Sequence, residues 1–250
     1  SDGGVSSRYS LSAQWADLSE AGGWTAQAYA VRYHLNLWSN FSYFESDPVN
    51  GDQFEQPDDR LMLGGGLARQ WRHGSEAQPW HSTLGLSVRH DEADVGLYDT
   101  VRRTRLSTTR DDQVRITAWS WYFEQAVQGA PRWRTVWGLR GDQQRFSVLS
   151  RTDDRNTGVA TDALWSPKLS MVFGPWQRTE WFVNLGRGFH SNDARGVTAR
   201  VDPDGNPVER VPGLVSGFSR ELGVRSEWWP GLQTWLALWG LHMASRLLSV

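Results

Sequence analysis

The sequence predicts an all-β fold, namely part of an antiparallel transmembrane β-barrel with about 10 long strands joined as a meander. Three observations predict it. Strand-like runs of alternating polarity, about 10 residues long, recur along the chain, and a tilted strand needs that length to cross a bilayer. Short glycine- and proline-containing breaks alternate with long polar segments. Sixteen tryptophans in 250 residues gather near the short breaks, and tryptophan is favoured at membrane–water interfaces.

The composition excludes several classes of protein. A formal net charge of −2 and an isoelectric point near 6.3 give no basic field, so we expect no nucleic-acid partner. The absence of cysteine excludes disulfide scaffolds, CxxC zinc sites and thiol catalysis. No run of 18 apolar residues occurs and the mean hydropathy is −0.55, which argues against transmembrane helices but not against strands that are apolar on one face. We expect no cofactor and no resident metal.

Five short breaks divide the chain, at 22–23, 74–79, 129–131, 174–175 and 230–231. Aromatic residues stand on both sides of each break. Rings placed symmetrically about tight turns predict a belt at one level of the structure, where indole rings sit at the membrane interface. The predicted belt consists of Trp15, Trp24, Trp71, Trp80, Trp133, Trp176, Trp229 and Trp235.

The strands between the breaks alternate with a period of two. Segment 9–15 has its apolar residues at odd positions, and segment 83–89 places Leu84, Leu86 and Val88 on one face. Segment 31–38 alternates in the same way, with arginine, histidine and asparagine together on the other face. Outward apolar and inward polar groups are typical of a membrane barrel, so a polar set is predicted to face the lumen. This set is Arg32, His34, Asn36, Arg89 and Arg115.

The other strand ends join through long polar segments, at about 45–60, 93–112, 149–161 and 191–212. Short turns at one end and long loops at the other are typical of outer-membrane barrels. The last strand is predicted at 232–250, although leucines spaced through it also permit a helix. An open 10-stranded sheet would leave unpaired edges in lipid, so we expect this chain to be a contiguous piece of a larger barrel.

Two ordered motifs carry a resemblance to a known family. The stretch 184–196 reads Asn-Leu-Gly-Arg-Gly-Phe-His-Ser-Asn-Asp-Ala-Arg-Gly, and the stretch 37–44 reads Leu-Trp-Ser-Asn-Phe-Ser-Tyr-Phe, followed by Asp-Pro-Val-Asn-Gly-Asp-Gln at 47–53 and by Gln56. Both resemble parts of the barrel of TonB-dependent outer-membrane receptors. Ser-Pro-Lys at 166–168, before a strand, is a weaker third match.

The resemblance implies a 22-stranded barrel filled by an N-terminal plug, in the outer membrane of a Gram-negative bacterium. It implies uptake of a scarce ligand, such as a ferric siderophore or another metal chelate, with energy relayed through TonB. The chain shows no plug, no energy-coupling box and no closing strand, so residues 1–250 are expected to be the central part of the barrel. Expected partners are outer-membrane lipid, the missing plug, TonB through the missing N-terminal region, and the small-molecule ligand, with the protein a monomer.

The polar run of the longer motif has two interpretations. It contains serine, histidine and aspartate, but sequence neighbours rarely form a catalytic triad and no GxSxG elbow occurs, so we expect no enzyme. The run either anchors a loop through hydrogen bonds to the local backbone or contacts the ligand or the plug. The residues expected to make ligand or plug contacts are His190, Asn192, Asp193 and Arg195, together with Asp52 and Gln53 of the shorter motif. The lumen-facing arginines could line a passage or pair with carboxylates of the plug.

Two rival functions stay open at this point. A passive porin-like channel would share the strand pattern but would have an open lumen and no plug. A soluble tryptophan-rich β-propeller, acting as a binding module, is suggested by the regular spacing of the breaks. Propeller blades hold four short strands in each repeat, whereas here each interval holds two long ones.

Overall fold

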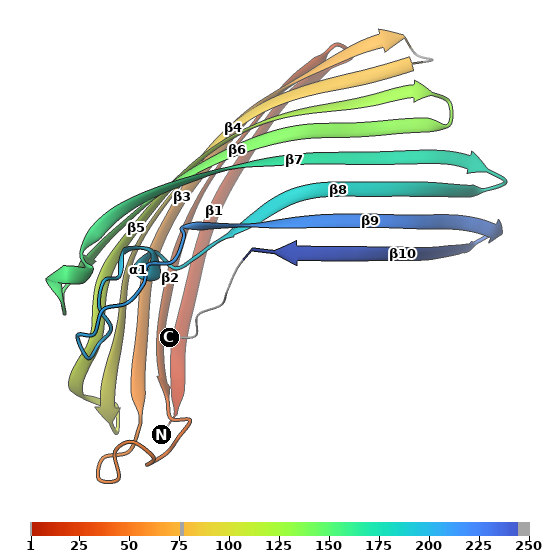
Figure 1. The fold of residues 1–250 in the computed structure, drawn as a ribbon. Coiled ribbons are helices and arrows are strands. Elements are labelled where there is room, and N and C mark those ends of the chain that lie inside the picture. The colour runs from red at the N-terminus through yellow and green to blue at the C-terminus, as the bar shows by residue number, and fades with distance from the viewer. Residues whose placement is uncertain (1, 76–77, 245–250) are drawn as a thin grey trace.

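The computed structural model describes residues 2–75 and 78–244, which form one antiparallel ten-stranded sheet (Figure 1). Each strand pairs with the next one in sequence, so the sheet is a meander. This confirms the all-β prediction and the number of strands, and it excludes the separate blades of a propeller. The strands are β1 Gly3–Ser19, β2 Gly22–Ser39, β3 Phe54–Ser75, β4 Gln78–Val101, β5 Thr104–Ala130, β6 Trp133–Ser150, β7 Gly158–Trp176, β8 Thr179–Ser191, β9 Leu214–Trp229 and β10 Leu232–Met243.

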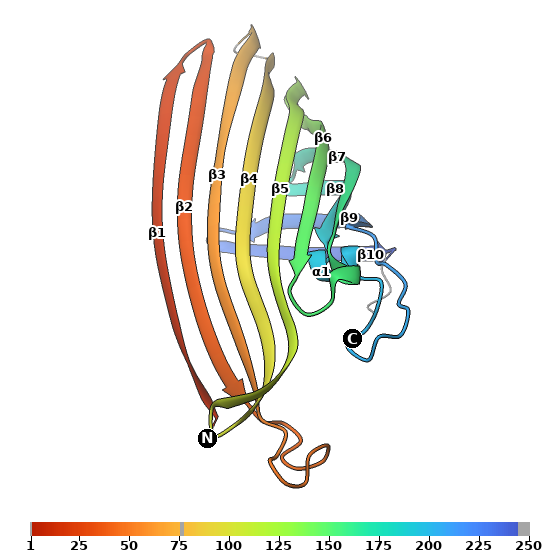
Figure 2. The ribbon, with the colours of Figure 1, turned by 90° about the vertical axis from the view of Figure 1, so that its left-hand side faces the viewer.

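The sheet curls strongly from β1 to β10, and the short helix α1 (Ala194–Thr198) lies in the hollow of the curl (Figures 1 and 2). The strand register fixes which side chains share each face, because directly paired residues point the same way. One row crosses five strands through Leu67, Leu86, Trp121, Gly141 and Trp165. We call the face that carries this row the convex face, and the face on which α1 packs the concave face.

The core lies on the concave face. Phe146 is fully buried, and it clusters with Val114, Val148 and Leu164 of the sheet. Ala194 and Val197 of α1 and Leu214 of β9 complete the cluster. The core therefore holds the helix against the inner wall of the sheet.

The connections confirm an asymmetry between the two ends of the sheet but correct its details. At one end the strands join through tight turns, such as Gln177 and Arg178 between β7 and β8. At the other end, long connections run over 40–53, 151–157 and 192–213, and the middle one contains the 3-10 helix η1 (Asp154–Asn156). The loop predicted at 93–112 is wrong, because β4 and β5 continue as a hairpin to a turn at Arg102 and Arg103. A polar sequence is as compatible with a solvated hairpin as with a loop.

The strands are longer than a bilayer crossing requires. β3, β4 and β5 contain 22, 24 and 27 residues, whereas a tilted transmembrane strand needs about 9–11. Neither of the short helices in the described ranges is long or apolar enough to cross a membrane. The predicted last strand is confirmed over Leu232–Met243, and residues 245–250 of that prediction lie outside the described residues.

Four of the five residues predicted to face the lumen lie on the convex face instead. Arg32 pairs with Leu61, Leu61 with Glu92, and Glu92 with Arg115, in a row parallel to the row of Leu67 and Trp121. His34 and Asn36 have the same parity as Arg32, and of the predicted set Arg89 alone lies on the concave face. Alternation in a sequence shows that the two faces of a strand differ in polarity, but it does not show which face points into the barrel. Beyond the row of Leu67, Leu86, Trp121 and Trp165 the convex face becomes polar. The polar residues of segment 31–38 therefore point away from the hollow of the curl, and its apolar residues point toward it.

Candidate functional site

The long connection after β8 is built around the cap of α1. The Asp193 carboxylate accepts the Arg195 backbone N–H at 2.9 Å, which satisfies one of the free amides of the first helical turn. The Arg195 guanidinium also donates to it, with Nε to Oδ1 at 3.0 Å and Nη2 to Oδ2 at 2.6 Å. Burial raises the pKa of Asp193, but the hydrogen bonds and charge of Arg195 outweigh it, and the pKa is lowered. Asp193 is therefore a charged anchor at neutral pH.

The whole connection runs over 192–213, and we call it the motif loop. Hydrogen bonds hold it in place. Asn192 donates from Nδ2 to the Pro212 carbonyl at 2.8 Å, which joins the two ends of the loop. Asn156 of η1 accepts the backbone N–H of Arg200 at 2.8 Å and donates to the Val201 carbonyl at 3.0 Å. Together with the apolar contacts of α1, these bonds hold the loop on the concave face.

His190 is the last but one residue of β8, the strand that leads into the motif loop, and it pairs with Val215. Its Nδ1 atom is buried and has no hydrogen-bond partner among the described residues. Buried polar atoms are normally hydrogen-bonded. Of the four predicted contact residues in the longer motif, Asn192, Asp193 and Arg195 are engaged in holding the loop, and His190 retains an unused polar atom.

The connection 40–53, which carries the shorter motif, is held by carboxylates. Asp52 accepts three backbone N–H groups, from Glu45 at 2.9 Å, Ser46 at 3.0 Å and Asp47 at 2.7 Å. These bonds, led by those from Ser46 and Asp47, lower the pKa of Asp52. Gln53 is buried and accepts the Arg103 backbone N–H at 2.9 Å. The structure thus places both predicted residues inside the scaffold of the connection.

The concave wall carries charged pairs that the sequence patterns did not identify. Arg140 pairs with Asp142 at 2.7 Å, and Arg89 pairs with Asp91 at 2.8 Å. Lys168 pairs with Glu124 across neighbouring strands, and Glu180 pairs with both Arg134 and Arg225. Arg140 and Asp142 lie two residues apart in one strand, as do Arg89 and Asp91, so the alternation within these strands could have revealed those two pairs.

A polar cavity of about 160 Å³ lies beside the motif loop, between α1, η1 and the ends of β5 and β6. Arg110, Asp112, Asn156, Arg195 and Asp202 contribute to its lining. Asp112 is buried. Within the described ranges, no group of three histidine or acidic side chains is arranged to hold a metal ion. The cavity offers hydrogen-bond donors and acceptors of both charges to a polar molecule.

Most of the predicted belt tryptophans lie on the convex face near the tight turns. Arg69 lies over the rings of Trp24 and Trp71, at 5.2 and 5.8 Å from their centroids. His73 stacks on Trp80, and Trp133 stacks on Phe173. Trp15 also lies on this face, Trp176 and Trp229 stand beside turns, and all three are exposed. Trp235 differs, because a register shift after Leu232 pairs it with Arg225 on the concave face.

The fold is similar to that of several solved transporters and receptors. The ferric citrate transporter FecA superposes with a TM-score of 0.76 at 12% identity, over 97% of this chain and 35% of that one. The siderophore receptor PiuA from Acinetobacter baumannii gives 0.70 at 11%, over 95% and 40%. The ferric yersiniabactin uptake receptor FyuA from Yersinia pestis gives 0.68 at 10%, over 97% and 36%. No curated protein sequence matches this chain.

The chain therefore spans a little over a third of the length of these solved structures. Identities of this size establish the fold, and the family is established by sequence. The family model of the TonB-dependent receptor-like β-barrel matches residues 1–247, and the chain belongs to that family.

Proposed function

We propose that the full-length protein is a TonB-dependent receptor in the outer membrane of a Gram-negative bacterium, and that it takes up a scarce ligand such as a ferric siderophore. Residues 1–250 are the central part of its barrel. The family consists of transporters and receptors rather than enzymes, and it lies in the Gram-negative outer membrane, which supports the proposal.

The observation that carries the proposal is the seating of the motif loop. A loop of 192–213 packs through Ala194 and Val197 onto the concave face, at the end of the sheet opposite the tight turns. In a membrane barrel that end faces the cell exterior. A ligand entering from outside would meet the motif loop and the polar cavity beside it first.

The motif residues have two roles in this proposal. One role is to fix the shape of the motif loop and of the connection 40–53 through the hydrogen bonds described above. The residues with this role are Asn192, Asp193, Arg195, Asp52 and Gln53. Their remaining polar surface, together with that of His190, contacts the ligand or the plug. The charge pairs of the concave wall, including Arg89 with Asp91, face the plug, which fits inside the curl.

The remaining partners follow from the same proposal. Outer-membrane lipid covers the convex face around the row of Leu67, Leu86, Trp121 and Trp165, and TonB engages a segment that precedes the barrel. The receptor works as a monomer, because a closed barrel leaves no strand edge to pair with another copy.

The test is uptake of radioiron by a strain that lacks the full-length gene and by the same strain carrying it. The iron is supplied in turn as ferric citrate, as a ferric trihydroxamate and as a ferric catecholate. We expect at least one complex to enter only with the gene present and only when TonB is intact. Uptake that persists without TonB would instead support the passive channel, and the absence of gene-dependent uptake for all three complexes would contradict iron as the cargo.

A further inference from the structure

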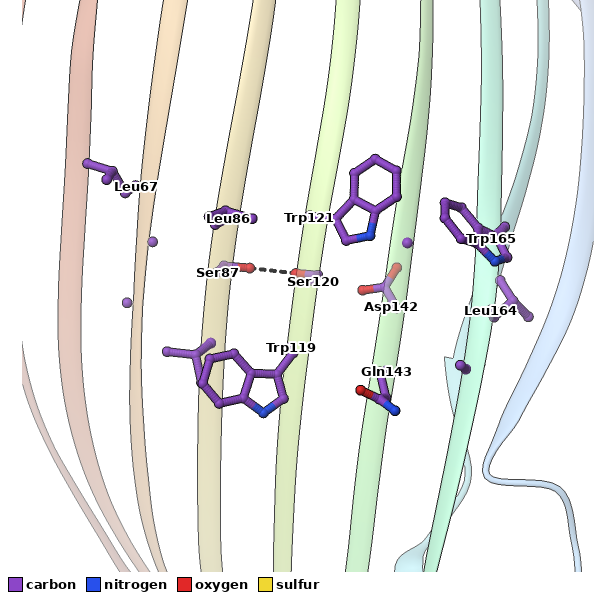
Figure 3. Close-up of a pocket in the computed structure, with 15 residues that line it drawn as sticks. Leu67, Leu86, Ser87, Trp119, Ser120, Trp121, Asp142, Gln143, Leu164 and Trp165 are labelled. Carbon is purple, nitrogen blue, oxygen red and sulfur yellow. Dashed lines mark hydrogen bonds between the residues drawn. The ribbon is translucent and has the colours of Figure 1, made fainter.

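The convex face carries a recess between three tryptophans (Figure 3). Trp119 lies toward β4, whereas Trp121 turns the other way and lies on β6. The ring of Trp121 meets Trp165 edge-on, with centroids 5.0 Å apart, and its Nε1 is 2.7 Å from the point where a side chain at Gly141 would begin. Because Trp119 and Trp121 turn in opposite directions, a gap lies between these two rings.

The recess is roomy and apolar. Its volume is about 540 Å³, within the range of small-molecule sites. Gly65, Gly141 and Ala163 supply almost no side chain, and Leu67, Leu86 and Val88 supply hydrocarbon. Trp119 and Trp165 are 59% and 52% exposed, so the walls of the recess are open to whatever covers the convex face.

A polar row borders the recess on the side of the long loops. The register aligns His90, Thr117, Arg145 and Thr161 across four strands. Each lies two residues beyond a recess-lining position, or about 7 Å along its strand. His90 Nδ1 and Thr117 Oγ1 are 2.8 Å apart. The convex face thus changes from hydrocarbon to hydrogen-bonding groups within one row.

Arg145 differs from its neighbours on this face. Arg32 pairs with Asp59 at 3.3 Å, Arg115 with Glu92 at 2.8 Å, and Arg151 with Asp94 and Asp111. In the part of the chain that the structure describes, Arg145 is exposed and has no ion-pair partner. An exposed guanidinium without a carboxylate, directly above an apolar recess, matches a molecule that has an anionic head and a hydrocarbon tail.

We propose that the recess and Arg145 together bind one anionic phospholipid, with an acyl chain between the tryptophans and the phosphate on the guanidinium. A guanidinium binds phosphate oxygens through two parallel hydrogen bonds. A net anionic phospholipid is favoured over a zwitterionic one, because the ammonium group of a zwitterionic headgroup offsets the charge that its phosphate offers to Arg145. The threonines on either side of Arg145 add hydroxyl donors. This inference rests on the outer-membrane placement in the proposed function.

The test uses the full-length receptor in nanodiscs of phosphatidylcholine that contain a small fraction of photoactivatable phosphatidylglycerol. After illumination, mass spectrometry measures the lipid crosslinked to the peptides of β5, β6 and β7. We expect Arg145→Gln to reduce crosslinking about tenfold, the effect of losing one charge-assisted contact. Arg32→Gln, which removes an arginine already paired with Asp59, should leave it unchanged. Ala163→Phe fills the recess and should also abolish the crosslink.

Three results would overturn the proposal. The first is equal crosslinking of wild type and Arg145→Gln. The second is equal labelling by photoactivatable phosphatidylcholine, which carries the same phosphate without a net charge and would remove the role of the headgroup's net negative charge. The third is loss of the crosslink in millimolar inorganic phosphate together with full crosslinking in Ala163→Phe, which would assign the site to free phosphate. Membrane fractionation of the wild type separates the two proposals, since a receptor that reaches the outer membrane but fails these tests refutes only the lipid site.

Discussion

Asp193 is expected to control the order of the motif loop through the cap of α1. The Asp193 carboxylate accepts the Arg195 backbone N–H at 2.9 Å, and the Arg195 side chain donates two further bonds to it. Asp193→Ala removes both interactions. Asp193→Asn keeps an acceptor for the backbone N–H, because asparagine caps helices about as well as aspartate, and it removes only the charge.

The two variants should differ measurably. Loss of an N-cap costs about 1 kcal/mol, within a range of about 0.5–2. The Asp193 side chain is 55% exposed, so its ion pair with Arg195 adds only about 0–1 kcal/mol. We therefore expect Asp193→Ala to weaken the helix by about 1–3 kcal/mol and Asp193→Asn by less than about 1, where about 1.4 kcal/mol corresponds to a tenfold change in opening.

Amide hydrogen exchange in the full-length receptor measures this opening. The Val197 N–H bonds to the Asp193 carbonyl at 3.2 Å, and the Ala199 N–H bonds to the Arg195 carbonyl at 2.9 Å, so both amides report on α1. Their exchange should rise about fivefold or more in Asp193→Ala and less than about fivefold in Asp193→Asn. Asp202→Ala, in the same loop but bonded to Asn206, is the control and should leave both amides unchanged. Equal rates in Asp193→Ala and wild type would refute the capping argument.

Three further outcomes are expected. Phe146→Ala empties the centre of the core and should cost about 3–5 kcal/mol, seen as faster amide exchange across 192–213 while β1 and β2 keep their protection. Gly64→Ala places a methyl group 2.3 Å from Tyr29 Cζ and should lower the temperature at which the barrel loses its heat-modifiable gel mobility, whereas Gly186→Ala, whose nearest neighbour is 3.7 Å away, should not. Because the folded-state pKa of Asp52 is lowered, its stabilisation of 40–53 is present above the unfolded value near 4 and is lost as the pH falls through the folded value. Amide hydrogen exchange across 40–53, taken relative to the intrinsic rate at each pH, should therefore rise in acid for the wild type and should already be raised at neutral pH in Asp52→Asn.

Much of the fold could be predicted because its signals are local. A glycine or proline break with aromatic neighbours needs no knowledge of the partner strand, and all five short breaks lie at or beside the turns between strands. The extent of the hairpin around Arg102 could not be predicted, because the same polar residues suit a loop and a solvated strand. The prediction that Arg32 faces the lumen was wrong for a different reason. A period of two fixes two faces, and only pairing with Leu61 and Glu92 identifies the side on which each lies.

The candidate site could be predicted in its location but not in its chemistry. The motif at 184–196 marked the strand end and loop correctly, yet a sequence cannot show that Asp193 bonds to Arg195 or that Asn192 reaches Pro212. Those partners depend on the path of the loop over the core around Phe146. Arg145 could not be singled out either, because its distinguishing property is that the residues paired with it on the two neighbouring strands are Thr117 and Thr161 rather than carboxylates.

Aromatic rings that lie close against glycines of the concave wall restrict which substitutions this sequence can accept. Side chains at Gly64, Gly85 and Gly223 would begin 2.3, 2.1 and 2.1 Å from the rings of Tyr29, Tyr122 and Phe182. Each glycine is therefore committed to the ring on the neighbouring strand, and a larger residue is acceptable there only if the ring is lost. Such pairs should covary among relatives as reciprocal large-for-small exchanges. Strand neighbours in other members of the family could then be read from sequences alone.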